Sequence, residues 1–182
     1  MLDPDPSIDI AVIVDKPCWK KSVSHRGWEI LIQPAVLEAL RQSQWTQGGE
    51  INILLTDDAT LQELNKKHRG RDHPTNVLSF PSLEPSGVFD NKKHEETPVI
   101  LGDIALAFET IQQESLAQNK PFEHHVAHLT VHGVLHLLGF DHEQEEDALM
   151  MESLEIKVLS SLMIPNPYQE PRNQNDENVK RT

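Results

Sequence analysis

The sequence predicts an α+β fold, a small mixed four-stranded sheet packed with about five helices. Four short segments rich in β-branched and aliphatic residues have the composition of strands. Helical segments lie between and after them, but strands and helices do not alternate strictly, so we expect a mixed sheet with helices packed against it. A chain of 182 residues is long enough for one domain with a sizeable core.

The predicted strands are apolar segments bounded by polar or turn-forming residues. Pro81 ends the third of them, because a proline cannot donate a backbone hydrogen bond within a sheet. The strands are expected at residues 8–14, 50–56, 75–80 and 102–108.

The predicted helices follow from capping residues and apolar spacing. Thr56, Asp57 and Asp58 offer N-caps for a helix that ends at Gly70. Pro121 suits the first turn of another helix. Pro34 either begins a helix at its first turn or kinks a longer one. The helices are expected at residues 28–44, 59–68, 109–118, from 121 to about 138, and 145–162. We expect the fourth, a metal-binding helix, to be central.

We expect a single domain over residues 1–164, with a long surface loop at 81–98 that contains prolines and mixed charge. Residues 165–182 are polar with three prolines and are expected to be disordered. The acidic N-terminus lacks the features of a secretory signal, and no apolar run approaches the length needed to cross a bilayer. With one cysteine, which suits a reducing compartment, the sequence predicts a soluble cytoplasmic protein.

The formal charge of −13 argues against tight, non-specific binding of nucleic acid, because contacts with phosphates need a positive surface. Some basic residues are nevertheless clustered: Lys66, Lys67, Arg69 and Arg71 lie within six positions. A local positive cleft on an acidic body therefore stays open, and these four are candidate substrate-binding residues.

Three histidines mark a candidate metal site. His132 and His136 are four residues apart, so on a helix they project from one face. Gly139 can adopt the left-handed conformation that ends a helix, after which the chain can return and present His142 to the same point. Three neutral nitrogen donors without a fourth protein ligand are typical of a catalytic zinc site. The alternative is a histidine-rich helix whose imidazoles bond with carboxylates and water.

The same histidine spacing occurs in metzincin proteases, whose motif is H-E-x-x-H-x-x-G-x-x-H. Those enzymes need the glutamate directly after the first histidine as a general base. Here that position is Gly133. The motif itself supplies no such base, which makes a protease the less favoured interpretation.

Residues 131–142 closely resemble the hallmark H-G-x-L-H-L-x-G-Y-D-H of the YbeY-type endoribonucleases, a family of rRNA maturation factors. Phe140 stands where the family usually has tyrosine, so one hydroxyl near the turn is lost. Residues 65–80 and 101–104 also look like segments of this family. The resemblance covers the chain from about residue 50 to residue 142.

The resemblance implies one Zn²⁺ per chain held by His132, His136 and His142. It implies cleavage of single-stranded RNA in 16S rRNA 3′ end maturation and ribosome quality control. The implied partners are ribosomal RNA and the small ribosomal subunit with its associated proteins, and neither DNA nor a membrane. It also implies that Arg69 lies in the cleft facing the metal. There a guanidinium would stabilise the charge that develops on a phosphate, so Arg69, His132 and His136 are the expected catalytic residues.

Two carboxylates are weaker candidates for supporting the metal site. Asp103 could orient a ligand, although an acidic residue at a strand start is as often a turn residue. Asp141 could brace an imidazole or form the turn before His142. Two other functions stay open: a metalloprotease with metzincin spacing, and a non-catalytic, zinc-stabilised ribosome-assembly factor. Nickel or cobalt could also bind three such nitrogens.

Overall fold

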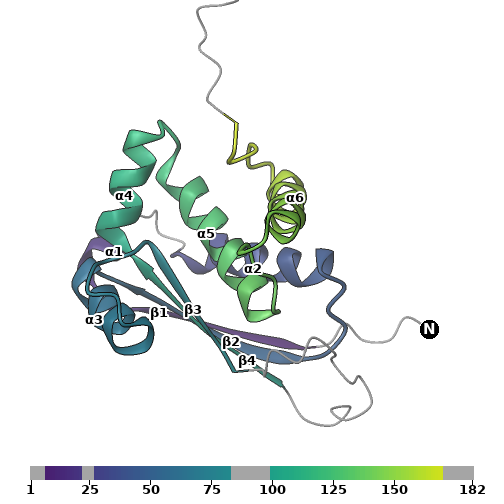
Figure 1. Ribbon diagram of the computed structural model, residues 1–182, viewed down its shortest axis with the longest axis horizontal. Coiled ribbons are helices and arrows are strands. Elements are labelled where there is room, and N and C mark those ends of the chain that lie inside the picture. Colours follow the sequence, from purple (N-terminus) through teal and green to yellow (C-terminus); the bar gives the residue numbers. More distant parts are fainter. Residues whose placement is uncertain (1–6, 22–26, 83–98, 170–182) are drawn as a thin grey trace, which may run out of the picture.

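The computed structural model describes residues 7–21, 27–82 and 99–169. Within these ranges a four-stranded mixed sheet has one helix, α3, on one face and a layer of helices on the other (Figure 1). The predicted α+β fold is confirmed, with six helices in the described ranges rather than about five. The additional helix is the short α1 (Pro17–Lys21), which buries Trp19 in the main core.

The sheet has the strand order β1-β2-β4-β3. Strands β1, β2 and β4 run parallel to one another, and β3 pairs with β4 in the antiparallel direction at one edge. Pro81 belongs to β3 instead of ending it, because an edge strand tolerates a residue that cannot donate a hydrogen bond. The strands are β1 (Ile8–Val14), β2 (Gly49–Thr56), β3 (Val77–Pro81) and β4 (Val99–Ala107).

The five longer helices lie close to their predicted positions. Pro34 is inside the first of them and not in its first turn. Asp57 caps α3 by accepting a hydrogen bond from the backbone N–H of Thr60 (2.9 Å), and Gly70 ends α3 with φ of 69°. The helices are α2 (Glu29–Gln42), α3 (Asp58–Arg69), α4 (Phe108–Ala117), α5 (Phe122–Leu137) and α6 (Glu145–Ser161).

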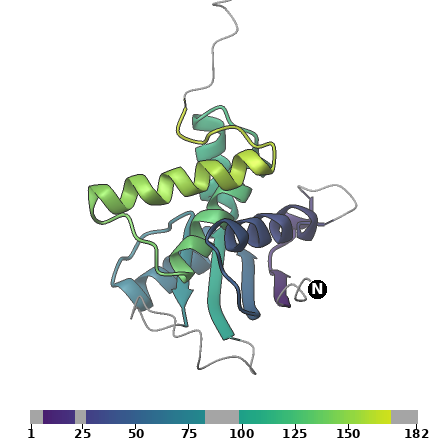
Figure 2. The same ribbon diagram turned by 90° about the vertical axis from the view of Figure 1, so that its right-hand side faces the viewer.

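Helix α5 is the centre of the helical layer, as predicted. It contacts α2, α4 and α6 as well as strands β3 and β4, and ten of its sixteen residues are buried. Figure 2 shows α6 on the side of α5 away from the sheet. The histidines of α5 are therefore positioned by the helix that has the most buried residues in the described part of the chain.

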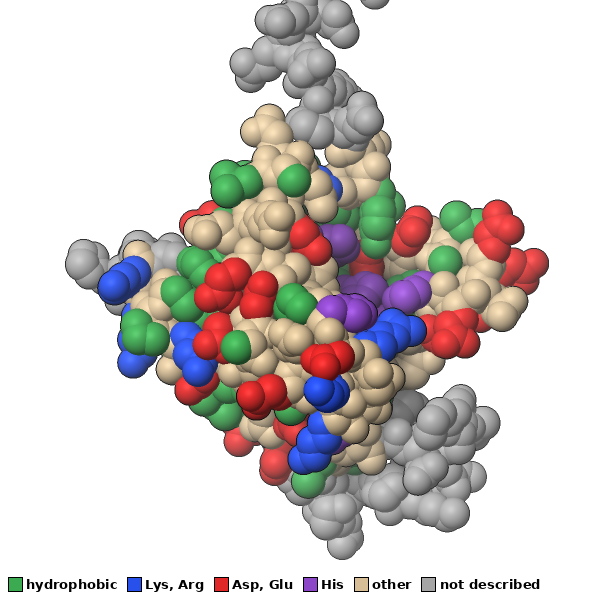
Figure 3. Space-filling model, turned by 60° about the vertical axis from the view of Figure 1, so that its left-hand side comes forward, with side chains coloured by type: hydrophobic (Ala, Val, Ile, Leu, Met, Phe, Trp, Pro, Cys, Tyr) green, Lys and Arg blue, Asp and Glu red, His purple; other side chains and the backbone are tan. Residues whose placement is uncertain are grey.

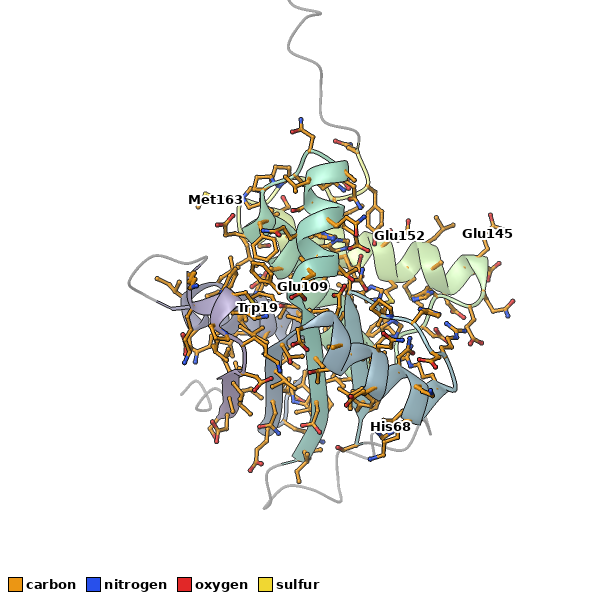
Figure 4. The ribbon with its side chains drawn as sticks, turned by 90° about the vertical axis from the view of Figure 1, so that its left-hand side faces the viewer. Trp19, His68, Glu109, Glu145, Glu152 and Met163 are labelled. Carbon is orange, nitrogen blue, oxygen red and sulfur yellow. The ribbon has the colours of Figure 1, made fainter. Side chains whose placement is uncertain are left out.

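Helix α3 covers the opposite face of the sheet. Its Leu61 packs with Ala105 and Ala107 of β4 in a second, smaller core. At one end Glu109 of α4 accepts a hydrogen bond from the N–H of Asp58 (3.0 Å), which fixes the start of α3. Figure 4 labels Glu109 at this end of α3 and His68 near the other end. His68 packs edge-to-face on Phe80 of β3, with ring centroids 5.1 Å apart. The basic end of α3 therefore lies at the β3 edge of the sheet.

The segment after α6 differs from the prediction of a disordered tail. Residues 165–169 follow a defined path, because Lys120 donates a hydrogen bond to the carbonyl of Pro167 and the hydroxyl of Tyr168 donates one to Glu155. The rest of the predicted tail, 170–182, and positions 83–98 of the predicted loop lie outside the described residues. No helix in the described ranges is long and apolar enough to cross a membrane.

Candidate metal centre

Gly133 lies on the side of α5 that packs against the sheet. A Cβ added there would lie 3.0 Å from two side-chain carbons of Ile104 and 3.2 Å from the hydroxyl oxygen of Ser79. The helix therefore lies so close to β3 and β4 that a larger residue would require Ile104 or Ser79 to shift by a few tenths of an ångström. A metzincin protease carries its general base at this position. A glutamate here would have its Cβ against Ile104 of β4 and Ser79 of β3.

Gly133→Ala should lower the free energy of unfolding by about 0.5–2 kcal/mol, because the cost of about 1–3 kcal/mol for overpacking the contact with Ile104 exceeds the gain of about 0.5–1 kcal/mol from removing a glycine from a helix. Urea denaturation would measure this. The exposed Glu123 on the same helix offers a control, since Glu123→Ala should change stability by less than about 0.5 kcal/mol. Equal stabilities of the wild type and Gly133→Ala would show that the close approach is not required.

The three predicted histidines meet at one point. One ring nitrogen each of His132, His136 and His142 lies within 4.8 Å of the others, and the Nε2 atoms of His132 and His136 are 3.0 Å apart. The first two rings are half-buried and His142 is exposed, so the cluster opens to solvent on one side. This arrangement suits a metal with three protein ligands and an open position.

The turn after α5 brings His142 back to the helix. Gly139 has φ of 88°; its N–H donates to His136 O (3.0 Å), and the Phe140 N–H donates to Leu135 O (3.0 Å). These two bonds form a Schellman motif, the helix ending that needs a left-handed residue. The same turn places the carbonyl of Phe140 2.9 Å from His136 Nδ1. The turn at Gly139 thus brings His142 back toward α5 and helps to orient the imidazole of His136.

Two of the histidines have fixed tautomers. His132 Nδ1–H donates to Glu155 Oε1 (2.8 Å), and His136 Nδ1–H donates to the carbonyl of Phe140 (2.9 Å). In both rings the Nε2 lone pair is left for a metal, and a partner at Nδ1 is typical of metal-binding histidines. Burial, followed by the nearby charges of His132 and His142, lowers the pKa of His136 to about 4. His136 is therefore neutral near pH 7, as a metal ligand must be.

Glu155 of α6 is the residue that organises these imidazoles. Its side chain is 1% exposed, and its Oε2 accepts hydrogen bonds from His128 Nε2 (3.0 Å) and from the hydroxyl of Tyr168. Burial acts to raise the pKa of this carboxyl, but the bonds with His128, His132 and Tyr168 outweigh it and hold the pKa at about 2. Glu155 is therefore an anion whose two oxygens are both occupied.

Sequence reasoning missed Glu155, because the acidic run after His142 suggested a solvated helix start. That interpretation holds for the first turn of α6, where Glu145 and Glu146 are exposed. It fails for Glu155, which lies between Met151 and Val158 on the buried face of α6. A carboxylate in the middle of an apolar stripe was the signal that could have identified it.

Glu155→Gln should weaken metal binding by about 10- to 100-fold while leaving the fold intact, because the amide keeps the shape but replaces one acceptor with a donor. Titration of the metal-stripped protein with Zn²⁺ would measure the affinity, and circular dichroism the fold. Glu152→Gln on the same helix is a matched control without a hydrogen bond to these imidazoles. Unchanged affinity in Glu155→Gln would show that the carboxylate has no part in metal binding.

The four predicted substrate-binding residues lie at the end of α3 and just after it, and all are exposed. Lys66 forms an ion pair with Asp72 (2.6 Å), so its charge is partly compensated. Within the described ranges no residue forms a hydrogen bond or ion pair with Arg69, whose guanidinium is available to a ligand. Figure 3 shows basic side chains directly beside histidines in a hollow on this face.

Neither of the two carboxylate candidates forms a hydrogen bond with the three imidazoles. Asp103 shares a face of β4 with Ala105, which packs with α3, and its Oδ1 accepts a hydrogen bond from Asn52 (2.9 Å). Because α5 covers the other face, the sheet separates Asp103 from the histidines. Asp141 Oδ1 accepts a hydrogen bond from the backbone N–H of His142 (2.7 Å), so it shapes the turn.

Three comparisons relate this chain to known proteins. The family model described as Endoribonuclease YbeY matches residues 14–163. A protein named Endoribonuclease YbeY from Nitrobacter hamburgensis is 45% identical over 164 residues, 90% of this chain and 82% of that protein. One of the same name from Bradyrhizobium diazoefficiens is 44% identical, covering 90% of this chain and 85% of that protein. A solution structure of a Thermotoga maritima protein aligns with a TM-score of 0.54 and 22% identity over 91% of this chain and 99% of that one, which bears on the fold.

Proposed function

Because the chain belongs to the YbeY family of endoribonucleases, we propose that it is a metal-dependent endoribonuclease that cleaves single-stranded RNA. The observation that carries the proposal is the convergence of three histidine nitrogens within 4.8 Å. The exposed basic end of α3 supports it, since a cleft that binds RNA needs positive charge beside its metal.

The donor set fits one Zn²⁺ per chain. His132 and His136 would offer Nε2, because their Nδ1 atoms are engaged by Glu155 and by the carbonyl of Phe140. His142 would supply the third nitrogen. When bound, the metal supplies Lewis-acid stabilisation of negative charge and a lowered pKa for water at its open position.

The side chains around the metal would bind and orient the RNA. Arg69 holds the phosphate at the cleavage site through its planar, permanently charged guanidinium. Lys67 and Arg71 attract the neighbouring backbone, and Lys66 contributes less because of its ion pair with Asp72. Glu155 is not the general base, since both of its oxygens already accept hydrogen bonds.

The biological substrate we propose is ribosomal RNA, in 16S rRNA 3′ end maturation and ribosome quality control in the cytoplasm. The partners would be the small ribosomal subunit and its associated proteins. A net charge of −13 suits such a role. Electrostatic repulsion between the acidic protein and the RNA backbone limits binding to substrates that fit the local basic surface.

The proposal is tested by offering the purified, metal-loaded protein a single-stranded RNA, the same sequence as a duplex, and casein. We expect cleavage of the single strand, much slower cleavage of the duplex, and no cleavage of casein. Casein cleavage without RNA cleavage would support the metalloprotease instead. RNA binding without cleavage at any metal loading would support the non-catalytic assembly factor.

A further inference from the structure

A cavity of about 390 Å³ lies next to the metal centre and is used by none of the chemistry above. The turn between α4 and α5, the first half of α5 and the segment 164–169 enclose it. Its volume is within the range of small-molecule sites, which run from about 300 to 1,000 Å³. It is large enough for one nucleobase and part of its sugar.

The cavity and the metal centre share a wall. His128 lines the cavity and lies one helical turn before His132, with ring centroids 6.5 Å apart. Both rings donate to the carboxylate of Glu155. When a phosphate of an RNA strand lies at the three-histidine cluster, a neighbouring nucleotide of that RNA is therefore within reach of the cavity.

The lining has the chemistry that single-stranded RNA needs. His124, His125 and His128 offer flat rings, and prolines 121, 165 and 167 offer apolar surfaces, so a base can stack without strict sequence preference. The amides of Asn119, Asn166 and Gln169 are also in the lining. None of the described lining residues is acidic, in a chain with a formal charge of −13.

One polar atom of a lining residue, His125 Nδ1, has no hydrogen-bond partner among the described residues. The side chain of His125 is 6% exposed; its Nε2–H donates to Glu114 (2.7 Å), and its Nδ1 accepts no hydrogen bond from the described residues. A buried acceptor without a partner is costly, and a ligand that carries an N–H group would satisfy it. The amino and imino groups of nucleobases are such donors.

We propose that this cavity is a nucleobase subsite, which holds one base of the single-stranded RNA whose phosphate lies at His132, His136 and His142. The inference rests on the proposed endoribonuclease function and adds the site that fixes the position of the strand. Lys120 stabilises the subsite by joining the α4–α5 turn to the carbonyl of Pro167.

The test scans a short RNA with a single abasic position at each nucleotide and measures kcat/KM of the full-length, metal-loaded protein. One abasic position should lower kcat/KM about tenfold, in line with the loss of one stacked base. In the cavity variant, which combines His124→Ala with Gln169→Ala, an abasic nucleotide at that position should lower kcat/KM no more than one at any other position. Gln113→Ala, an exposed glutamine of α4 outside the cavity, should behave as the wild type.

A second measurement is independent of cleavage. A nucleoside monophosphate added to the metal-free protein should shift the NMR signals of the His124 and His125 rings at millimolar concentration, and the cavity variant should show no shift at the remaining ring. Two results would overturn the subsite and leave the proposed endoribonuclease function intact. One is an equal loss of kcat/KM at every abasic position. The other is a loss of kcat/KM in the cavity variant at the same abasic position as in the wild type. Absence of RNA cleavage and binding would remove both.

Discussion

His136→Ala should lower the Zn²⁺ affinity of the metal-stripped protein by well over a hundredfold and reduce RNA cleavage to the background rate. Loss of a residue that merely supports a ligand costs about 10- to 100-fold, so loss of a ligand must cost more. His136 is the central donor, since its Nε2 lies 3.0 Å from that of His132 and its pKa of about 4 keeps it neutral. Isothermal titration with Zn²⁺ gives the affinity and a fluorescent RNA the rate.

His68→Ala is the matched control for this variant. His68 is also a histidine near the basic segment, but it packs on Phe80 at the β3 edge. It should retain one Zn²⁺ per chain and most of the cleavage rate. A His136→Ala protein that binds metal as tightly as the wild type would contradict the assignment of the three ligands.

Arg69→Ala should lower kcat for RNA cleavage by about 10²- to 10³-fold without changing Zn²⁺ affinity. In the proposed function the guanidinium stabilises charge that develops on the phosphate, and loss of one such donor typically costs about 2.7–4 kcal/mol. Arg69→Lys should recover part of the rate, because a lysine keeps the charge but not the planar pair of donors. Single-turnover cleavage at saturating protein separates this effect from weaker RNA binding.

Arg41→Ala is the matched control, because it also removes one positive charge from the protein. Arg41 is an exposed arginine on α2 that pairs with Glu38 (2.6 Å), and it lies outside the basic segment at the end of α3. It should cleave RNA at the wild-type rate. A comparable loss in Arg41→Ala, or full activity in Arg69→Ala, would show that Arg69 has no specific role at the phosphate.

Local features of the fold were predictable because they depend on neighbours in sequence. The capping of α3 by Asp57 and its ending at Gly70 follow from side-chain chemistry within one turn. The spacing of His132 and His136 fixes a common helix face, and the glycine turn explains the return of His142. Contacts of this range are encoded in short segments.

Features that depend on distant packing were not predictable in the same way. Glu155 reaches His132 only because α6 packs on α5, and Tyr168 reaches Glu155 because the segment after α6 returns to α5. Asp103 was a reasonable candidate in sequence, but the alternation of side chains along β4 places it on the face covered by α3. The cavity at His124–His128 likewise exists only when three separate segments meet.

Gly133 illustrates how the structure sharpens an interpretation from sequence. In the motif it indicates the absence of a protease base. In the fold it faces Ile104 and Ser79, so the position serves the close packing of α5 on the sheet. The difference from metzincin proteases therefore has a structural cause in addition to a chemical one.

The central claim is that the three-histidine cluster holds one metal ion on which RNA cleavage depends. The most direct test strips the protein of metal, returns Zn²⁺ in steps, and measures bound metal and single-stranded RNA cleavage on the same samples. We predict that cleavage rises in proportion to bound Zn²⁺ and reaches its maximum at one ion per chain. Full cleavage by the metal-free protein, or metal uptake of one ion per chain with no cleavage, would contradict the claim.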